Sequence, residues 1–160
     1  MQALAFLALL LTAIALVPGG AHLASLPNKM RMERDAYFVV QQVYAGWQLF
    51  GVPLIGALLA NLGLAIALRG ARPARTLAFA AALTLAASLA VFFAWTFPAN
   101  QATANWTTIP ANWEALRRQW ELAHAAGALL TLLAFVCAAL AVLSAAPPRS
   151  QVRRNGAPRI

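Results

Sequence analysis

Four long stretches of the sequence contain no Lys, Arg, Asp or Glu, and each of them holds an apolar run. A helix needs about 20 apolar residues to cross a hydrocarbon core about 30 Å thick. Every stretch is long enough to supply one such helix. In chain order they are Ala3 to about Leu23 and the stretches between Asp35 and Arg69, between Arg75 and Glu114, and between Glu121 and Arg149.

The composition agrees with a membrane protein. Hydrophobic residues make up 62% of the chain and charged residues only 10%, whereas a soluble domain has about 25% charged residues. The sequence lacks the alternation of polar and apolar residues that would indicate a β-barrel. We therefore expect an all-α integral membrane four-helix bundle, with helices at about 3–23, 43–68, 76–97 and 112–145. These form one domain, 1–146, and a basic disordered tail follows at 147–160.

The first apolar run has an alternative interpretation as a cleaved signal peptide. It has no Lys or Arg ahead of its apolar residues, and no clean cleavage site follows it. These features favour a spanning helix, although Pro18, Gly19 and Gly20 interrupt the run. The single cysteine, Cys137, excludes an intramolecular disulfide.

The distribution of Lys and Arg predicts the orientation of the bundle. The short turn between the second and third helices and the C-terminal tail carry seven positive residues and no acid. The two longer connections carry five positive and all four acidic residues, a net charge of +1. Because positive loops stay inside, we expect both termini in the cytoplasm and both long connections outside.

The formal charge of +8 therefore indicates orientation, and we expect no nucleic-acid partner. The basic tail would attract anionic membrane lipid. Faces rich in small residues on the second and third helices allow close helix packing. Such faces are also compatible with an oligomer.

This topology gathers polar and aromatic residues at the outer end of the bundle. Both histidines, His22 and His124, fall there, as do Asn28, Lys29 and all five tryptophans. Aromatic residues at that depth are typical of an interfacial belt, but a belt usually marks both interfaces. The cytoplasmic end has no Trp or Tyr, and this asymmetry equally favours an aromatic-lined site.

The start of the fourth helix is the densest part of this region. Trp113, Arg117, Glu121 and His124 follow one another along a single helix face. The simplest interpretation is an Arg117–Glu121 pair on a solvated face. Alternatively, the ionisable groups face a cavity, as such groups do at membrane depth.

Two metal-binding arrangements remain open for these residues. His22, Glu121 and His124 could supply a two-histidine, one-carboxylate metal site. The two histidines could instead bind one haem from opposite sides. A dinuclear centre is poorly supported because Glu121-x-x-His124 occurs only once.

The segment FPANQATANWTTIPANWEALRRQWELAHAAGALL resembles the anthrone-oxygenase-like family of small four-helix membrane proteins, often labelled a domain of unknown function. GGAHLASLPNKM and QQVYAGW are similar to segments of its bacterial members. The resemblance implies oxidation of polycyclic anthrones to anthraquinones by O₂ without a bound cofactor, in a bacterial cytoplasmic membrane. Positions that match its recurring pattern are Asn100, Asn112, Trp113, Arg117, Trp120, Glu121 and His124.

We therefore expect an oxygenase or other oxidoreductase acting on a hydrophobic aromatic small molecule at the outer face. His124 or His22 would act as general base, and Arg117 and Asn112 would stabilise the oxyanion. The expected catalytic residues are His124, His22, Glu121 and Arg117. The expected substrate-binding residues are Asn100, Asn112, Trp113, Trp120, Trp47, Asn28 and Lys29. Two alternatives stay open, a haem- or metal-binding membrane protein and a non-enzymatic module that binds lipid or a partner.

Overall fold

The computed structural model describes residues 1–145, so the predicted tail at 147–160 lies outside the described residues. The fold is an all-α bundle in which four helical stretches are long and apolar enough to cross a membrane. They are Gln2–Lys29, Trp47–Ala67, Arg72–Ala102 and Trp113–Ala145. The first and last are single α-helices, α1 (Gln2–Lys29) and α6 (Trp113–Ala145).

The two middle spans each contain a change of helix type. The second begins as a 3₁₀ turn, η2 (Trp47–Phe50), and continues as α3 (Gly51–Ala67). The third begins as α4 (Arg72–Val91), passes through a π-helical turn, η3 (Phe92–Thr96), and ends as α5 (Phe97–Ala102). A short helix, α2 (Arg34–Gln41), and a 3₁₀ turn, η1 (Gln42–Tyr44), join the first span to the second.

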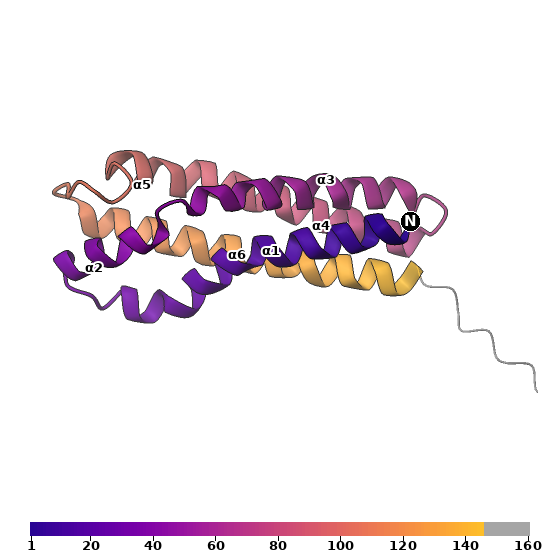
Figure 1. Cartoon of the computed structure of the whole chain (residues 1–160), viewed down its shortest axis with the longest axis horizontal. Coiled ribbons are helices and arrows are strands. Elements are labelled where there is room, and N and C mark those ends of the chain that lie inside the picture. The colour runs from indigo at the N-terminus through magenta and orange to yellow at the C-terminus, as the bar shows by residue number, and fades with distance from the viewer. Residues whose placement is uncertain (146–160) are drawn as a thin grey trace, which may run out of the picture.

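The four spans run alternately up and down. Neighbouring pairs are α1 with α3, α3 with α4, α4 with α6, and α6 with α1, which closes the bundle. The N-terminus, the α3–α4 turn and the end of α6 lie at one end (Figure 1). The short helices α2 and α5 lie at the opposite end, which we call the loop end (Figure 1).

Small residues, mostly alanine, make up most of the interior of the bundle, and many large apolar residues face outward. Ala8, Ala78 and Ala134 are fully buried, whereas Leu59 and Leu143 are mostly exposed. A soluble bundle does the reverse, because burying large side chains removes apolar surface from water. In a membrane, small residues let helices approach closely while large side chains contact lipid.

Polar contacts link the helices inside the bundle. Asn61 on α3 donates to Thr12 on α1, with 3.2 Å between Nδ2 and Oγ1. Thr131 on α6 donates to Ser88 on α4 at 3.4 Å. Hydrogen bonds of this kind hold helices together in lipid, where the hydrophobic effect between helices is absent.

Several helix boundaries differ from the sequence prediction. α1 ends at Lys29 rather than near residue 23, and Pro18, Gly19 and Gly20 do not interrupt it. The third span ends at Ala102 rather than at 97, and α6 begins at Trp113 rather than at 112. A proline inside a membrane helix is tolerated because local adjustment and neighbouring groups satisfy the freed backbone carbonyl.

The second predicted helix, 43–68, also starts differently. Gly46 has a positive φ of 87° and separates η1 from η2, so the α-helix proper begins only at Gly51. The residues between the first two predicted helices, 24–42, contain the end of α1 and all of α2. These differences decide which side chains meet at the loop end.

Candidate functional site

A cluster of buried polar side chains lies at the loop end, between α1, α2 and α6. His22, Lys29, Tyr37 and Glu121 are each at most 3% exposed. His22 lies about 30 Å along α1 from its start, at 1.5 Å per residue. Since the hydrocarbon core is also about 30 Å thick, the cluster sits at its boundary with the headgroups.

Lys29 and Glu121 form a buried ion pair at the centre of this cluster. The Nζ atom of Lys29 lies 2.8 Å from Oε2 of Glu121, and both side chains are almost completely shielded. Tyr37 on α2 donates its hydroxyl hydrogen to the other carboxylate oxygen, Oε1, at 3.0 Å. The carboxylate on α6 therefore joins α1 and α2, which lie far from it in sequence.

Tyr37 stays a neutral donor in this position. Burial, with the Glu121 carboxylate beside it, raises the pKa of the Tyr37 phenol well above its usual range. Gln41, one helical turn further along α2, is also buried, and neither of its amide atoms has a hydrogen-bond partner.

The two histidines lie side by side, with ring centroids 4.3 Å apart and planes tilted by 53°. Lys29 Nζ lies 3.1 Å from Nδ1 of His22. An ammonium can only donate, so this Nδ1 is the acceptor and Nε2 carries the hydrogen. His124 Nδ1 lies 3.0 Å from the carbonyl oxygen of Trp120, which can only accept, so His124 Nδ1 carries the hydrogen. The Nε2 atom of a neutral His124 therefore keeps a free lone pair.

Aromatic rings enclose the histidine pair. The Trp120 ring centroid is 4.0 Å from that of His124 and 4.8 Å from that of His22. Tyr44 and Trp47 lie 4.3 and 5.8 Å from His22. The Lys29 ammonium lies over the Tyr44 and Trp120 rings, at 5.1 and 5.2 Å from their centroids, where the ring faces attract a cation.

Asn100 on α5 fixes the position of two of the tryptophans. Its Oδ1 atom accepts hydrogen bonds from Nε1 of Trp120 at 2.7 Å and from Nε1 of Trp106 at 3.3 Å. Trp106 is buried and lies within a run of three left-handed residues, Ala104, Asn105 and Trp106. Non-glycine residues adopt that conformation at an energetic cost, which the buried Trp106 contacts offset.

Arg117 does not pair with Glu121, so the simple surface-pair interpretation of that spacing is wrong. Its Nη1 atom donates to the carbonyl oxygen of Met32 at 2.8 Å. Its guanidinium lies 4.7 Å from the Trp113 ring centroid and 5.4 Å from that of Tyr37. Arg117 therefore joins α6 to the α1–α2 connection at the edge of the cluster.

The predicted site residues fall into three groups. His22, His124, Glu121, Lys29, Trp120 and Trp47 meet in the cluster, and Asn100 supports it. Arg117 and Trp113 lie at its edge, against Tyr37. Asn28 and Asn112 are exposed on the outer surface, away from the histidine pair.

The tryptophans divide between the two interpretations given by the sequence. Trp95, with Phe93 and Phe97, is largely exposed on the third span, as an interfacial belt requires. Trp106 and Trp120 are buried, and Trp47 and Trp113 are partly buried. The aromatic asymmetry therefore has two causes, a belt on one face and a buried aromatic cluster beside it.

The arrangement of side chains in residues 1–145 does not favour the two metal-binding interpretations of the sequence. Among residues 1–145, no group of three His, Cys, Asp or Glu side chains lies close enough to share a metal ion. The Lys29 ammonium already occupies the space between His22 and Glu121. Two histidines on opposite sides of one metal keep their nitrogens about 4 Å apart and their ring centroids about 6 Å apart, further than the 4.3 Å found here.

Four members of the cluster were not among the residues predicted to form the site: Tyr37, Gln41, Tyr44 and Trp106. The signal for the first two is their spacing, because Tyr37 and Gln41 are four residues apart and share one helix face. Tyr44 lies in η1 and Trp106 in the left-handed turn, and neither conformation has a sequence pattern that identifies it.

Comparison of the chain with protein-family models, with curated proteins and with solved structures finds no match.

Proposed function

We propose that this protein is a membrane oxidoreductase, a cofactor-independent oxygenase that acts on a flat aromatic compound with an acidic C–H or phenolic group. The observation that carries the proposal is the His22–His124 pair, in contact with aromatic rings and adjoining a buried ammonium. The same chemistry is what the resemblance described under the sequence analysis implies. The proposal places the protein in a bacterial cytoplasmic membrane, with the cluster at the outer face.

The partly exposed side of the cluster provides the route for a substrate. His22 is buried, but His124, Tyr44 and Trp47 each keep part of their surface exposed. These rings lie at the depth where the hydrocarbon core meets the headgroups. A flat apolar molecule dissolved in the bilayer would reach them sideways and stack on them, without first entering water.

His124 is the proposed general base. Its Nδ1–H is held by the Trp120 carbonyl, which fixes the ring and leaves Nε2 free to accept a proton. Lys29 is the proposed stabiliser of the oxyanion that forms when the substrate loses that proton. The role first expected of Arg117 and Asn112 passes to Lys29 here, because Lys29 contacts His22 and Asn112 lies exposed on the surface.

The reaction balances with O₂ as the only oxidant. His124 removes one proton from the substrate CH₂ group, and the resulting carbanion is delocalised onto the substrate oxygen. The carbanion adds O₂, and the proton returns to give a hydroperoxide. Loss of water from the hydroperoxide then leaves a ketone, so CH₂ and O₂ become C=O and H₂O.

Turnover of an anthrone by the purified protein, with and without O₂, tests this proposal. We expect anthraquinone absorbance to appear only in air. His124→Gln should lower the rate by at least about a hundredfold, the usual contribution of a general base. Gln119→Ala, on the same helix but bonded only to the Trp95 carbonyl, serves as the control and should retain activity.

Thermal unfolding of each variant shows whether it remains folded. Wild-type protein that gives no oxygen-dependent product would contradict the proposal. So would a folded His124→Gln variant with the wild-type rate.

A further inference from the structure

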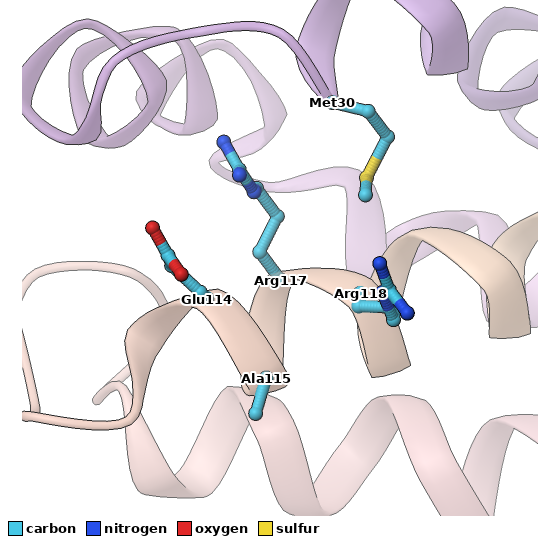
Figure 2. A pocket seen from close by; sticks show the side chains of 5 residues that line it. All are labelled: Met30, Glu114, Ala115, Arg117 and Arg118. Atoms are coloured by element: carbon cyan, nitrogen blue, oxygen red, sulfur yellow. The ribbon is translucent and has the colours of Figure 1, made fainter.

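A second feature of the loop end is a hollow on the outer surface, distinct from the histidine cluster. It has a volume of about 410 Å³, far more than the about 30 Å³ that a water molecule takes in the liquid. Figure 2 shows Met30, at the end of α1, extending toward the first turns of α6. The lining residues are Met30, Glu114, Ala115, Arg117 and Arg118.

The two arginines make one part of this hollow cationic. Within residues 1–145, neither guanidinium lies within ion-pair distance of a carboxylate, because the ion pairs found there are Lys29–Glu121 and Arg34–Asp35. Arg117 is held in place by the Met32 carbonyl and the Trp113 ring. Its Nε–H is shielded from water and has no hydrogen-bond partner. Arg117 therefore has both a donor without an acceptor and a positive charge without a carboxylate partner.

Glu114 gives the same hollow a negative side. It lies three and four residues before Arg117 and Arg118, a spacing at which ion pairs commonly form on a helix. In the described chain it forms no ion pair with either arginine. The hollow therefore presents a positive and a negative group that do not neutralise each other.

The depth of the hollow matches the headgroup layer of a bilayer. Arg118 lies about 40 Å along α6 from its C-terminal end, at 1.5 Å per residue. The hydrocarbon core accounts for about 30 Å of that length. The hollow is therefore about 10 Å beyond the core, among the phosphates of one leaflet.

We propose that this hollow binds the headgroup of a zwitterionic phospholipid with a primary ammonium, phosphatidylethanolamine. Arg117 and Arg118 receive the phosphate, for which guanidinium groups are well suited. Glu114 receives the ammonium, and Met30 contacts the glycerol and the first carbons of the acyl chains. Each charge of the headgroup then faces the opposite charge in the hollow, the phosphate beside the two arginines and the ammonium beside Glu114.

This match distinguishes phosphatidylethanolamine from two other common lipids. Phosphatidylcholine has the same charges, but its quaternary ammonium has no N–H to donate to Glu114. Phosphatidylglycerol has no cation and would leave Glu114 facing an anionic headgroup. The preference of the protein among these three lipids is therefore the measurable property.

The test measures binding of each lipid to delipidated full-length protein in detergent, by native mass spectrometry. We expect phosphatidylethanolamine to bind at least about tenfold more tightly than the other two, as for loss of one charged hydrogen bond. Arg118→Gln should weaken it by about tenfold. Glu114→Gln should abolish the preference over phosphatidylcholine while keeping binding to the phosphate. Arg31→Gln removes one exposed positive charge outside the hollow and should change nothing.

Soluble phosphoethanolamine, without acyl chains, distinguishes a lipid site from a site for a free phosphate ester. The proposal requires that it bind far more weakly than the lipid, because Met30 and the bilayer add apolar contacts. Tight binding of the soluble compound, equal binding of all three lipids, or equal effects of Arg118→Gln and Arg31→Gln would each overturn the proposal. These readouts do not depend on the proposed oxygenase activity.

Discussion

Lys29 is the residue through which the buried polar groups of the loop end are connected. It contacts the imidazole of His22, the carboxylate of Glu121 and the rings of Tyr44 and Trp120. An isolated buried charge is very costly, so Lys29 and Glu121 depend on each other. A buried pair of this kind is weak evidence for stability, since apolar residues often serve equally well. The position of the pair beside His22 agrees with the proposed role of the ammonium.

The effect of Tyr37→Phe on stability should depend on pH. Tyr37→Phe leaves Oε1 of Glu121 without its donor and should destabilise the protein by about 1–3 kcal/mol at pH 7. The raised pKa of Tyr37 in the folded state means that its phenol ionises first in unfolded chains, above about pH 10. The stabilisation that the neutral Tyr37 phenol gives the wild-type fold therefore decreases as pH rises further. The Tyr37→Phe variant has no phenol, so its stability does not change for this reason.

Thermal unfolding in detergent at pH 7 and at pH 11 checks this expectation. The difference in unfolding temperature between wild type and Tyr37→Phe should be smaller at pH 11 than at pH 7. Tyr44→Phe is the control at pH 7, because the Tyr44 hydroxyl makes no hydrogen bond among the described contacts. A gap that stayed constant or widened with pH would show that the phenol is not held neutral by burial.

At the level of helices, the charge-free stretches predict the four spans because length and apolarity alone decide whether a helix crosses a membrane. The end of α1 could not be predicted in this way. Pro18 and Pro27 both indicate an interruption, yet the helix runs through both to Lys29. Because of that continuation, Lys29 lies two turns beyond His22 on the same helix face, within reach of it and of Glu121.

Other parts of the candidate site depend on conformations that sequence patterns do not specify. The topology alone brings His22, Glu121 and His124 to one end of the bundle. The π-helical turn at Phe92–Thr96 and the left-handed run at Ala104–Trp106 contain no glycine to indicate them. They nevertheless orient Asn100 and Trp106 toward Trp120. Such irregular backbone is held by tertiary contacts rather than by local preference.

The close packing of α1 against α6 can be tested by enlarging Gly19, with the neighbouring Gly20 as the control. A Cβ at Gly19 would lie 3.1 Å from the Cα of Ala128, whereas one at Gly20 would meet nothing within 4 Å. Gly19→Leu should therefore separate the helices and destabilise the protein by about 1–3 kcal/mol, as overpacking does. Gly20→Leu should leave the unfolding temperature unchanged or raise it. Thermal unfolding in detergent compares the two, and equal effects would show that α1 and α6 do not approach closely at Gly19.

On the scale of the whole molecule, the outward-facing apolar residues and the distribution of charge both agree with a bundle that spans the membrane with its loop end outside. Leu59, Leu83 and Leu143 are mostly exposed, and contact with lipid makes such a surface stable. The turn between α3 and α4 lies at the end opposite the loop end (Figure 1). Arg69 lies in that turn, and Arg72 and Arg75 lie in the first turn of α4, so the positive-inside rule assigns this end to the cytoplasm. The candidate site and the proposed lipid hollow would then both belong to the outer leaflet.

Cysteine labelling of intact bacterial spheroplasts tests this orientation. In a Cys137→Ser background, Ala111→Cys lies on the loop end and Gly70→Cys on the opposite turn, where an added Cβ meets nothing within 4 Å. A membrane-impermeant maleimide should label Ala111→Cys from outside, and Gly70→Cys only after the membrane is opened. The reverse pattern would invert the orientation and move the candidate site to the cytoplasmic leaflet. Labelling of both from outside would contradict the spanning bundle itself, because the two positions are separated by the full length of α4.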